Sequence, residues 1–127
     1  MIQTDRERKV QEQIMRVLRK NGAYVYNNAQ NMYTEKGRPD LTACVPVKIS
    51  KLAEIFGNDT KVGLFIGLEV KRDEEHGYGI TDAQQIVGRK IQNAKGLWLS
   101  IDDVELIEAL LLKLGVNQDV IQWVFNL

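Results

Sequence analysis

The stretch GLFIGLEVK, residues 63–71, consists of six uncharged and mostly apolar residues followed by an acid, a valine and a base. Such a run is typical of a β-strand covered on both faces. Side chains alternate along a strand, so Glu69 and Lys71 share one face and Val70 takes the other. Two opposite charges that end an apolar strand indicate a functional site, and a solvated charge pair is the simpler alternative.

A second carboxylate lies upstream in the stretch GRPD, residues 37–40. Hard cations such as Mg²⁺ take oxygen ligands, usually one or two carboxylates with water and substrate phosphate. Asp40 and Glu69 are suitable ligands, and the Val70 carbonyl is a third candidate. Lys71, beside such an ion, would orient or deprotonate an attacking water. The pattern predicts a metal-dependent site that cleaves phosphodiester bonds, and a plain Pro-Asp turn is the alternative for Asp40.

The first helix is predicted from about Asp5 to Asn21, with Gly22 as its stop. Four apolar residues at helical spacing define its inward face: Val10, Ile14, Val17 and Leu18. Glu7 lies on that face near its solvent end, whereas Glu12 points roughly 160° away from Val10 and Ile14. Glu7 is therefore the helical carboxylate we expect at a site, with stabilisation of the helix dipole as an equal alternative.

Another helix is predicted to begin at Thr81. Thr81 and Gln84 have the spacing of a capping box, and Asp82 is favourable in a first helical turn. Capping alone explains Gln84 without any chemistry. The helix is expected to continue to about Ala94, and the apolar strand Leu97–Ile101 follows.

Taken in order along the chain, these features resemble the PD-(D/E)xK nucleases and, within them, the small stand-alone VRR-NUC domains of phages and bacteria. The resemblance spans about Asp5 to Ile101. The matching residues are Glu7 with Val10, Gln11 and Ile14 on the first helix, Gly37-x-Pro39-Asp40, Glu69-x-Lys71 and Thr81-x-x-Gln84.

That resemblance implies metal binding by Glu7, Asp40 and Glu69. It also implies that Lys71 serves the attacking water and that Gln84 supports the site. The implied fold is a restriction-endonuclease-like core, and the implied cofactor is Mg²⁺ or Mn²⁺. Stand-alone members are expected to be homodimers that cut branched DNA such as Holliday junctions, in repair or recombination. Open alternatives are a nuclease for flaps or single strands and a non-catalytic nucleic-acid-binding module on a nuclease fold.

The expected architecture is a single α/β domain over residues 1–127, since this length suits one hydrophobic core. Residues 45–62 are predicted to contain an inserted helix, and residues 102–127 to form a helical extension split at Gly115. A mixed central sheet flanked by helices is expected from four strands: Ala23–Asn27, Leu41–Val47, Leu64–Lys71 and Leu97–Ile101.

Charge is balanced overall, with 17 basic and 17 acidic residues, but residues 1–38 carry eight basic and four acidic ones. Bulk attraction to nucleic acid is thereby disfavoured, and local contacts matter more. Lys36 and Arg38, beside Asp40, are expected to contact phosphates, as is Arg72. The basic residues of the first helix fit a solvated face at least as well. Residues 27–33 are predicted to form an Asn-rich surface loop, and residues 72–79 a mobile loop next to the site.

Cys44 is the single cysteine, in an apolar run, and is expected to be a core residue in a reducing compartment. A Cys nucleophile and a zinc site are disfavoured because His76 is the one histidine. We find no apolar run long enough to span a membrane and no signal-peptide pattern, so a cytoplasmic protein is expected, in a bacterial or phage-infected cell.

Overall fold

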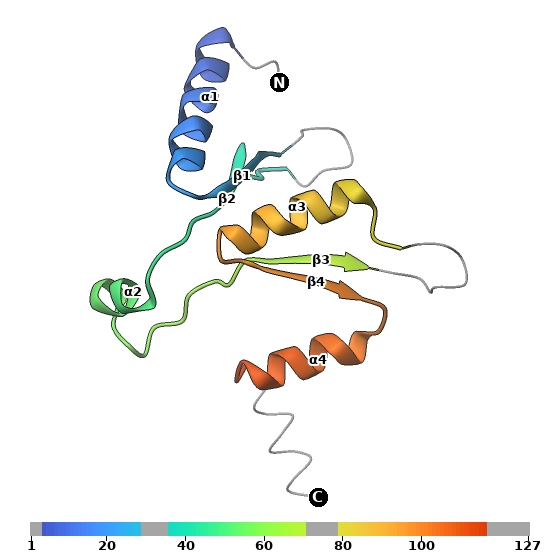
Figure 1. Ribbon diagram of the computed structural model, residues 1–127. Helices are drawn as coiled ribbons and strands as arrows, with labels where there is room; N and C mark the ends of the chain where they lie inside the picture. The colour runs from blue at the N-terminus through green and yellow to red at the C-terminus, as the bar shows by residue number, and fades with distance from the viewer. Residues whose placement is uncertain (1–3, 29–35, 71–78, 117–127) are drawn as a thin grey trace, which may run out of the picture. The chain divides into compact units, whose positions relative to one another are not determined.

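The computed structural model describes residues 4–28, 36–70 and 79–116. Within them the chain is mixed α/β, with four helices and two sheets of two strands each (Figure 1). The α/β class is therefore confirmed. The residues group into two compact units, Met1–Gly67 with Ile86–Trp98, and Leu68–Gln85 with Leu99–Leu127.

Helix α1 spans Asp5–Lys20, as the sequence predicts. Thr4 caps its start, because the Thr4 hydroxyl accepts a hydrogen bond of 3.1 Å from the Glu7 N–H. Asn21 follows the last turn, and Gly22 has φ of +84°, a left-handed conformation that glycine adopts without strain.

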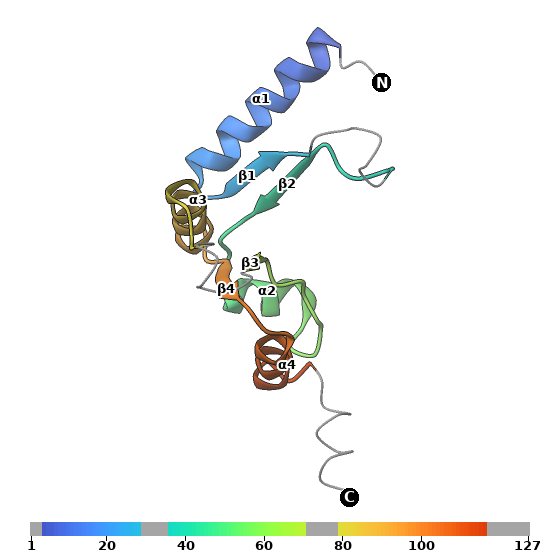
Figure 2. The same cartoon turned by 90° about the vertical axis from the view of Figure 1, so that its right-hand side faces the viewer.

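The face that α1 turns inward differs from the predicted one. Val10, Ile14 and Val17 are 45%, 44% and 60% exposed. The half-buried residues of α1 are instead Gln11, Met15 and Leu18, which lie about a quarter turn round the helix. Helix α1 lies beside strand β1, Tyr24–Asn27 (Figure 2), which follows it after a short turn and fixes which side is covered. Only Leu18 of the predicted face is partly buried.

Strand β1 pairs with β2, Leu41–Cys44, as an antiparallel pair. Tyr24 lies opposite Cys44, and Asn27 lies opposite Leu41. Val25 is 3% exposed, and Cys44 is a buried free thiol, as expected. Burial, partly offset by a hydrogen bond from the Gly96 backbone, raises the pKa of the Cys44 thiol.

Strand β3, Ile66–Val70, pairs with β4, Leu97–Ile101, and Figure 1 draws both arrows pointing the same way. Helix α3, Asp82–Asn93, connects them. Helix α3 approaches Trp98 of β4 closely because Gly88 has no side chain, since a Cβ there would lie 2.2 Å from Cδ2 of Trp98.

One face of β3 is less covered than the sequence predicts. Gly67 faces Ile91 of α3, so the helix covers that face. Leu68 and Val70 share the opposite face of the strand and are 46% and 81% exposed. The prediction of coverage on both faces, which concerned residues 63–68, is therefore wrong at Leu68.

The four predicted strands are confirmed in position, with β2 and β3 shorter than expected. Within the described ranges they pair as β1–β2 and β3–β4 rather than as one mixed central sheet. Strand pairing joins residues far apart in the sequence, so local patterns locate strands but do not choose their partners.

The inserted helix is present as α2, Ile49–Phe56. The C-terminal extension begins with α4, Val104–Lys113, capped by Asp103, whose carboxylate accepts a 3.0 Å hydrogen bond from the Glu105 N–H. The second helix predicted after Gly115 falls in residues 117–127, outside the described residues. None of the helices in the described ranges has the length and apolar character needed to cross a bilayer.

Candidate active site

The side-chain amide of Gln84, at the start of α3, forms hydrogen bonds with both Thr81 and Glu69. Its Oε1 accepts a hydrogen bond of 3.0 Å from the Thr81 N–H, and the Thr81 hydroxyl accepts one of 3.1 Å from the Gln84 N–H. This is the predicted capping box. On the other side of the same amide, Nε2 donates a 2.8 Å hydrogen bond to Oε2 of Glu69. The capping role and the contact with Glu69 are therefore compatible.

The two partners fix the orientation of the Gln84 amide. An N–H group requires an acceptor and a carboxylate requires a donor, so the assignment with Oε1 toward Thr81 and Nε2 toward Glu69 satisfies both. Glu69 is half-buried near the end of β3. A charge-assisted hydrogen bond from a side chain that is itself held in place restricts the rotamers of the Glu69 carboxylate.

The residues beside Glu69 are described in part. Val70 ends β3, and the exposure of its side chain leaves the strand end accessible. Lys71 and Arg72, the predicted catalytic lysine and phosphate contact, lie outside the described residues, as do His76 and most of the predicted 72–79 loop.

Asp40 is held in its turn by Asn28, the residue directly after β1. The Asn28 backbone N–H donates to the Asp40 carbonyl oxygen at 3.0 Å. Its side-chain Nδ2 donates at 2.7 Å both to the Pro39 carbonyl oxygen and to Oγ1 of Thr42. Its Oδ1 accepts from the Arg38 guanidinium at 3.0 Å. One amide therefore ties the GRPD turn to the ends of both strands, while the Asp40 residue remains exposed.

Sequence reasoning missed Asn28. It stands at the start of an Asn-rich stretch that reads as a loop, and no local signal distinguishes it from Asn27. Its role depends on the register of β1 against β2, which places it opposite Asp40. The rest of that predicted loop, residues 29–35, lies outside the described residues.

Two predicted phosphate contacts flank this turn. Arg38 is half-buried and hydrogen-bonded to Asn28, so part of its guanidinium already has a structural role. Lys36 is exposed. Both stay predictions as phosphate contacts.

Glu7 is exposed in the first turn of α1, together with Asp5. This position fits the alternative of helix-dipole stabilisation. Glu7 and Asp40 belong to the first unit, and Glu69, Val70 and Gln84 to the second. Among the described residues, no three His, Cys, Asp or Glu side chains form a group that could hold a metal ion. Metal binding by Glu7, Asp40 and Glu69 therefore stays a prediction.

Comparison of the chain with protein-family models, with curated proteins and with solved structures gave no match. The resemblance to PD-(D/E)xK nucleases consequently rests on the motifs of this sequence and their order.

Proposed function

We propose that this chain is a metal-dependent DNA endonuclease of the PD-(D/E)xK type, which hydrolyses phosphodiester bonds in branched DNA such as Holliday junctions. The observation that carries the proposal is the 2.8 Å hydrogen bond from Gln84 to Glu69. The motif order assigns one of these residues to metal binding and the other to support of the site. Those two roles require a direct contact between Gln84 and Glu69, whereas a capping role of Gln84 alone requires no such contact.

The donor chemistry fits Mg²⁺ or Mn²⁺. Carboxylate oxygens of Asp40 and Glu69 and the backbone carbonyl of Val70 are the hard oxygen ligands that these ions prefer. Glu7 is proposed as a further acid. When bound, such an ion supplies a Lewis acid for the scissile phosphate and favours ionisation of a nearby water.

The residues of the chain have the following proposed roles in the reaction. Lys71 orients the water that attacks the phosphorus in line with the leaving oxygen. As the neutral amine it would accept the proton of that water, and as the ammonium it would neutralise charge that builds on the phosphate. Gln84 keeps the Glu69 carboxylate in one orientation. Lys36, Arg38 and Arg72 hold phosphates of the substrate and fix its register on the protein.

The proposal extends to the assembly. Both sheets would belong to one restriction-endonuclease-like core within a single domain over residues 1–127, in a cytoplasmic protein. A homodimer with two-fold symmetry would present two sites, which is the arrangement needed for paired cuts in a four-way junction. Sedimentation at micromolar protein, with and without junction DNA, tests this part: a monomer under both conditions contradicts it.

The direct test is cleavage of labelled four-way junction, flap, single-stranded and linear duplex DNA with Mg²⁺, with Mn²⁺ or with EDTA. We expect metal-dependent paired cuts in the junction. Asp40→Asn removes one negative charge without removing volume, and it should abolish cleavage. Asp59→Asn is the matched control, because Asp59 is also an exposed loop aspartate and has no proposed role. Wild-type cleavage by Asp40→Asn would refute the assignment of the metal site.

The same assay separates the alternatives. Preferential cutting of flaps or single strands would retain the enzyme class and replace the substrate. Tight binding of DNA without cleavage in any metal would identify a non-catalytic module.

A further inference from the structure

Strand β1 carries two tyrosines on one face, because residues two apart on a strand project the same way. The ring centroids of Tyr24 and Tyr26 are 5.6 Å apart, with the planes tilted by 42°. Tyr24 also meets the ring of Phe65 edge-on, at a centroid distance of 6.2 Å. The inner ring is therefore anchored, while the outer residue, Tyr26, is 36% exposed.

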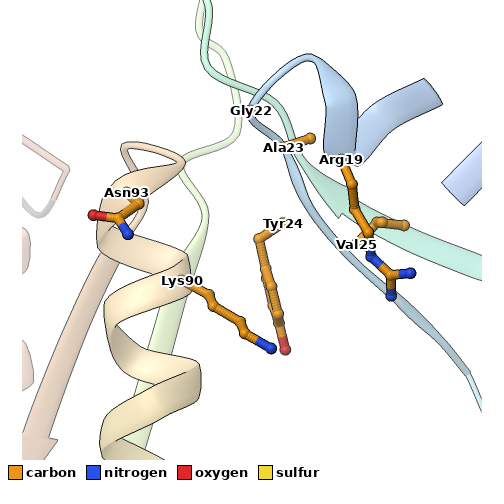
Figure 3. Close-up of a pocket in the computed structure, with 7 residues that line it drawn as sticks. All are labelled: Arg19, Gly22, Ala23, Tyr24, Val25, Lys90 and Asn93. Atoms are coloured by element: carbon orange, nitrogen blue, oxygen red, sulfur yellow. The ribbon is translucent and has the colours of Figure 1, made fainter. Parts of the chain in front are cut away.

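Beside Tyr24 lies a pocket of about 330 Å³ formed by α1, β1 and α3 (Figure 3). Figure 3 shows the Lys90 amine and the Tyr24 hydroxyl pointing toward each other. All residues of the pocket belong to the first compact unit. The lining residues are Arg19, Gly22, Ala23, Tyr24, Val25, Lys90 and Asn93.

The charge of this pocket favours an anion. Arg19 and Lys90 contribute two positive charges, and none of the described residues that line the pocket is an acid. Both cations stand in the last turn of a helix, where they also complement the helix dipole. Two helix C-termini contribute roughly −0.5 charge each, so the two cations leave a net charge of about +1. The nearest acid along α1 is Glu12, which lines the adjoining groove with Met15, Arg16 and Arg19.

The other end of β1 leads to the GRPD turn. Asn28 follows the strand and bonds Asp40 and Arg38. Asn28 is four positions after Tyr24, which is about 13 Å along a strand at roughly 3.3 Å per residue. A strip in the first unit therefore has cations at one end, an exposed aromatic ring along β1, and the Asp40 turn at the other end.

We infer that this strip binds a single strand of nucleic acid, with backbone phosphates at Lys90 and at Arg19 and an unpaired base stacked on Tyr26. Proteins that bind single strands combine a cationic groove for the backbone with aromatic side chains for the bases. A base in a duplex has no free face for stacking, so the exposed ring favours an unpaired strand over a duplex. For the nature of its ligand the inference rests on the proposed function, and it does not require cleavage.

The test is fluorescence anisotropy of a labelled 15-nucleotide oligothymidine and of a duplex of the same length, in EDTA, so that binding is measured without cleavage. We expect tighter binding of the single strand. Lys90→Gln should weaken that binding about three- to tenfold. It should also make the negative slope of log binding constant against log salt concentration shallower by about 0.7, the value for one phosphate contact on a single strand. The matched control is Arg89→Gln, because Arg89 is an adjacent exposed cation that does not line the pocket.

Tyr26→Leu tests the stacking step. Leucine retains apolar bulk but has no ring, so we expect about tenfold weaker binding with an unchanged salt slope. Circular dichroism of each variant establishes that it is folded. Equal affinity for duplex and single strand, equal losses in Lys90→Gln and Arg89→Gln, or an unchanged affinity in Tyr26→Leu would each overturn the inference.

Two further arms separate this inference from the proposed nuclease activity. Inorganic phosphate at millimolar concentration should compete weakly with the oligonucleotide; complete displacement would indicate a site for free phosphate and overturn the assignment to a strand. Single-strand binding that depends on Lys90 and Tyr26, in a protein that cleaves no DNA, would support the inference and refute the endonuclease. DNA cleavage by a protein whose single-strand binding is unchanged by both substitutions would support the endonuclease and refute the inference.

Discussion

Replacing Asn28 with alanine should destabilise the first unit more than the same replacement of an exposed asparagine would. The substitution removes three side-chain hydrogen bonds, to Pro39, Thr42 and Arg38, and retains the backbone bond to Asp40. Each such bond contributes about 0.5–1.5 kcal/mol net. Because one of the three is solvent-exposed and all share one amide, we expect a loss of about 2 kcal/mol rather than the full sum.

Urea unfolding followed by circular dichroism measures this loss. With a denaturant slope of roughly 1–2 kcal/mol/M for a chain of this size, the midpoint should fall by about 1–2 M. Asn27→Ala is the control, since Asn27 is the adjacent exposed residue of β1, and its effect should stay within about 0.5 kcal/mol. A change below about 0.5 kcal/mol in Asn28→Ala would refute the role assigned to this amide.

Asn28→Asp refines the same prediction. A carboxylate still accepts from Arg38 but has no N–H to donate to the Pro39 carbonyl oxygen, so the stability should fall between those of the alanine variant and the wild type. If Asp40 acts in cleavage, both variants should lose activity at temperatures where they remain folded, because the turn that carries this acid is no longer fixed.

Three further predictions concern the core and the start of α3. Gly88→Ala gains about 1 kcal/mol of helix propensity but places a Cβ 2.2 Å from Trp98, and such overpacking costs about 1–3 kcal/mol. Thermal unfolding should therefore show a net loss of stability. In a Trp98→Ala background, where the clash is absent, the same substitution should increase stability. Gln84→Glu keeps an acceptor for the helix cap but replaces the donor to Glu69 with a like charge. Far-UV circular dichroism should be unchanged, while the rate of DNA cleavage should fall at least tenfold. Cleavage at the wild-type rate would contradict the proposed support of Glu69 by Gln84. Because the pKa of Cys44 is raised in the folded state, the unfolded chain loses its thiol proton first as the pH rises. The free energy of unfolding should therefore fall as the pH rises from the ordinary cysteine pKa through the raised pKa. A Cys44→Ala protein whose stability has the same pH slope would contradict this.

The predictions from sequence that succeed depend on local signals. The start of α3 is specified by Thr81 and Gln84, which are three residues apart, and the structure contains both hydrogen bonds of that capping box. Strand β4 has the predicted bounds Leu97–Ile101, because a mostly apolar run, interrupted by Ser100 alone, ends at two aspartates. The inserted helix α2 likewise follows from apolar spacing within eight residues.

The predictions that fail depend on distant partners. Helical spacing identifies Val10 and Ile14 as one apolar face, but the strand that packs beside α1 determines which side is covered, and that is the Gln11 and Leu18 side. Neither the pairing of the strands nor the role of Asn28 is encoded within a short window. Asn28 becomes significant only when β2 brings Asp40 to it.

The shared amide of Gln84 links an ionisable acid to the nucleation of a helix. Since the amide bonds to Glu69 and to the cap in the same orientation, the two contacts stabilise each other. Thermodynamic reciprocity then requires that a cation bound to Glu69 changes the free energy of the first turn of α3 by the same amount as that turn changes the affinity of Glu69 for the cation. The backbone N–H of Thr81 thereby becomes a reporter of what the Glu69 carboxylate binds, and its hydrogen-exchange rate should change when a divalent cation is added to the protein.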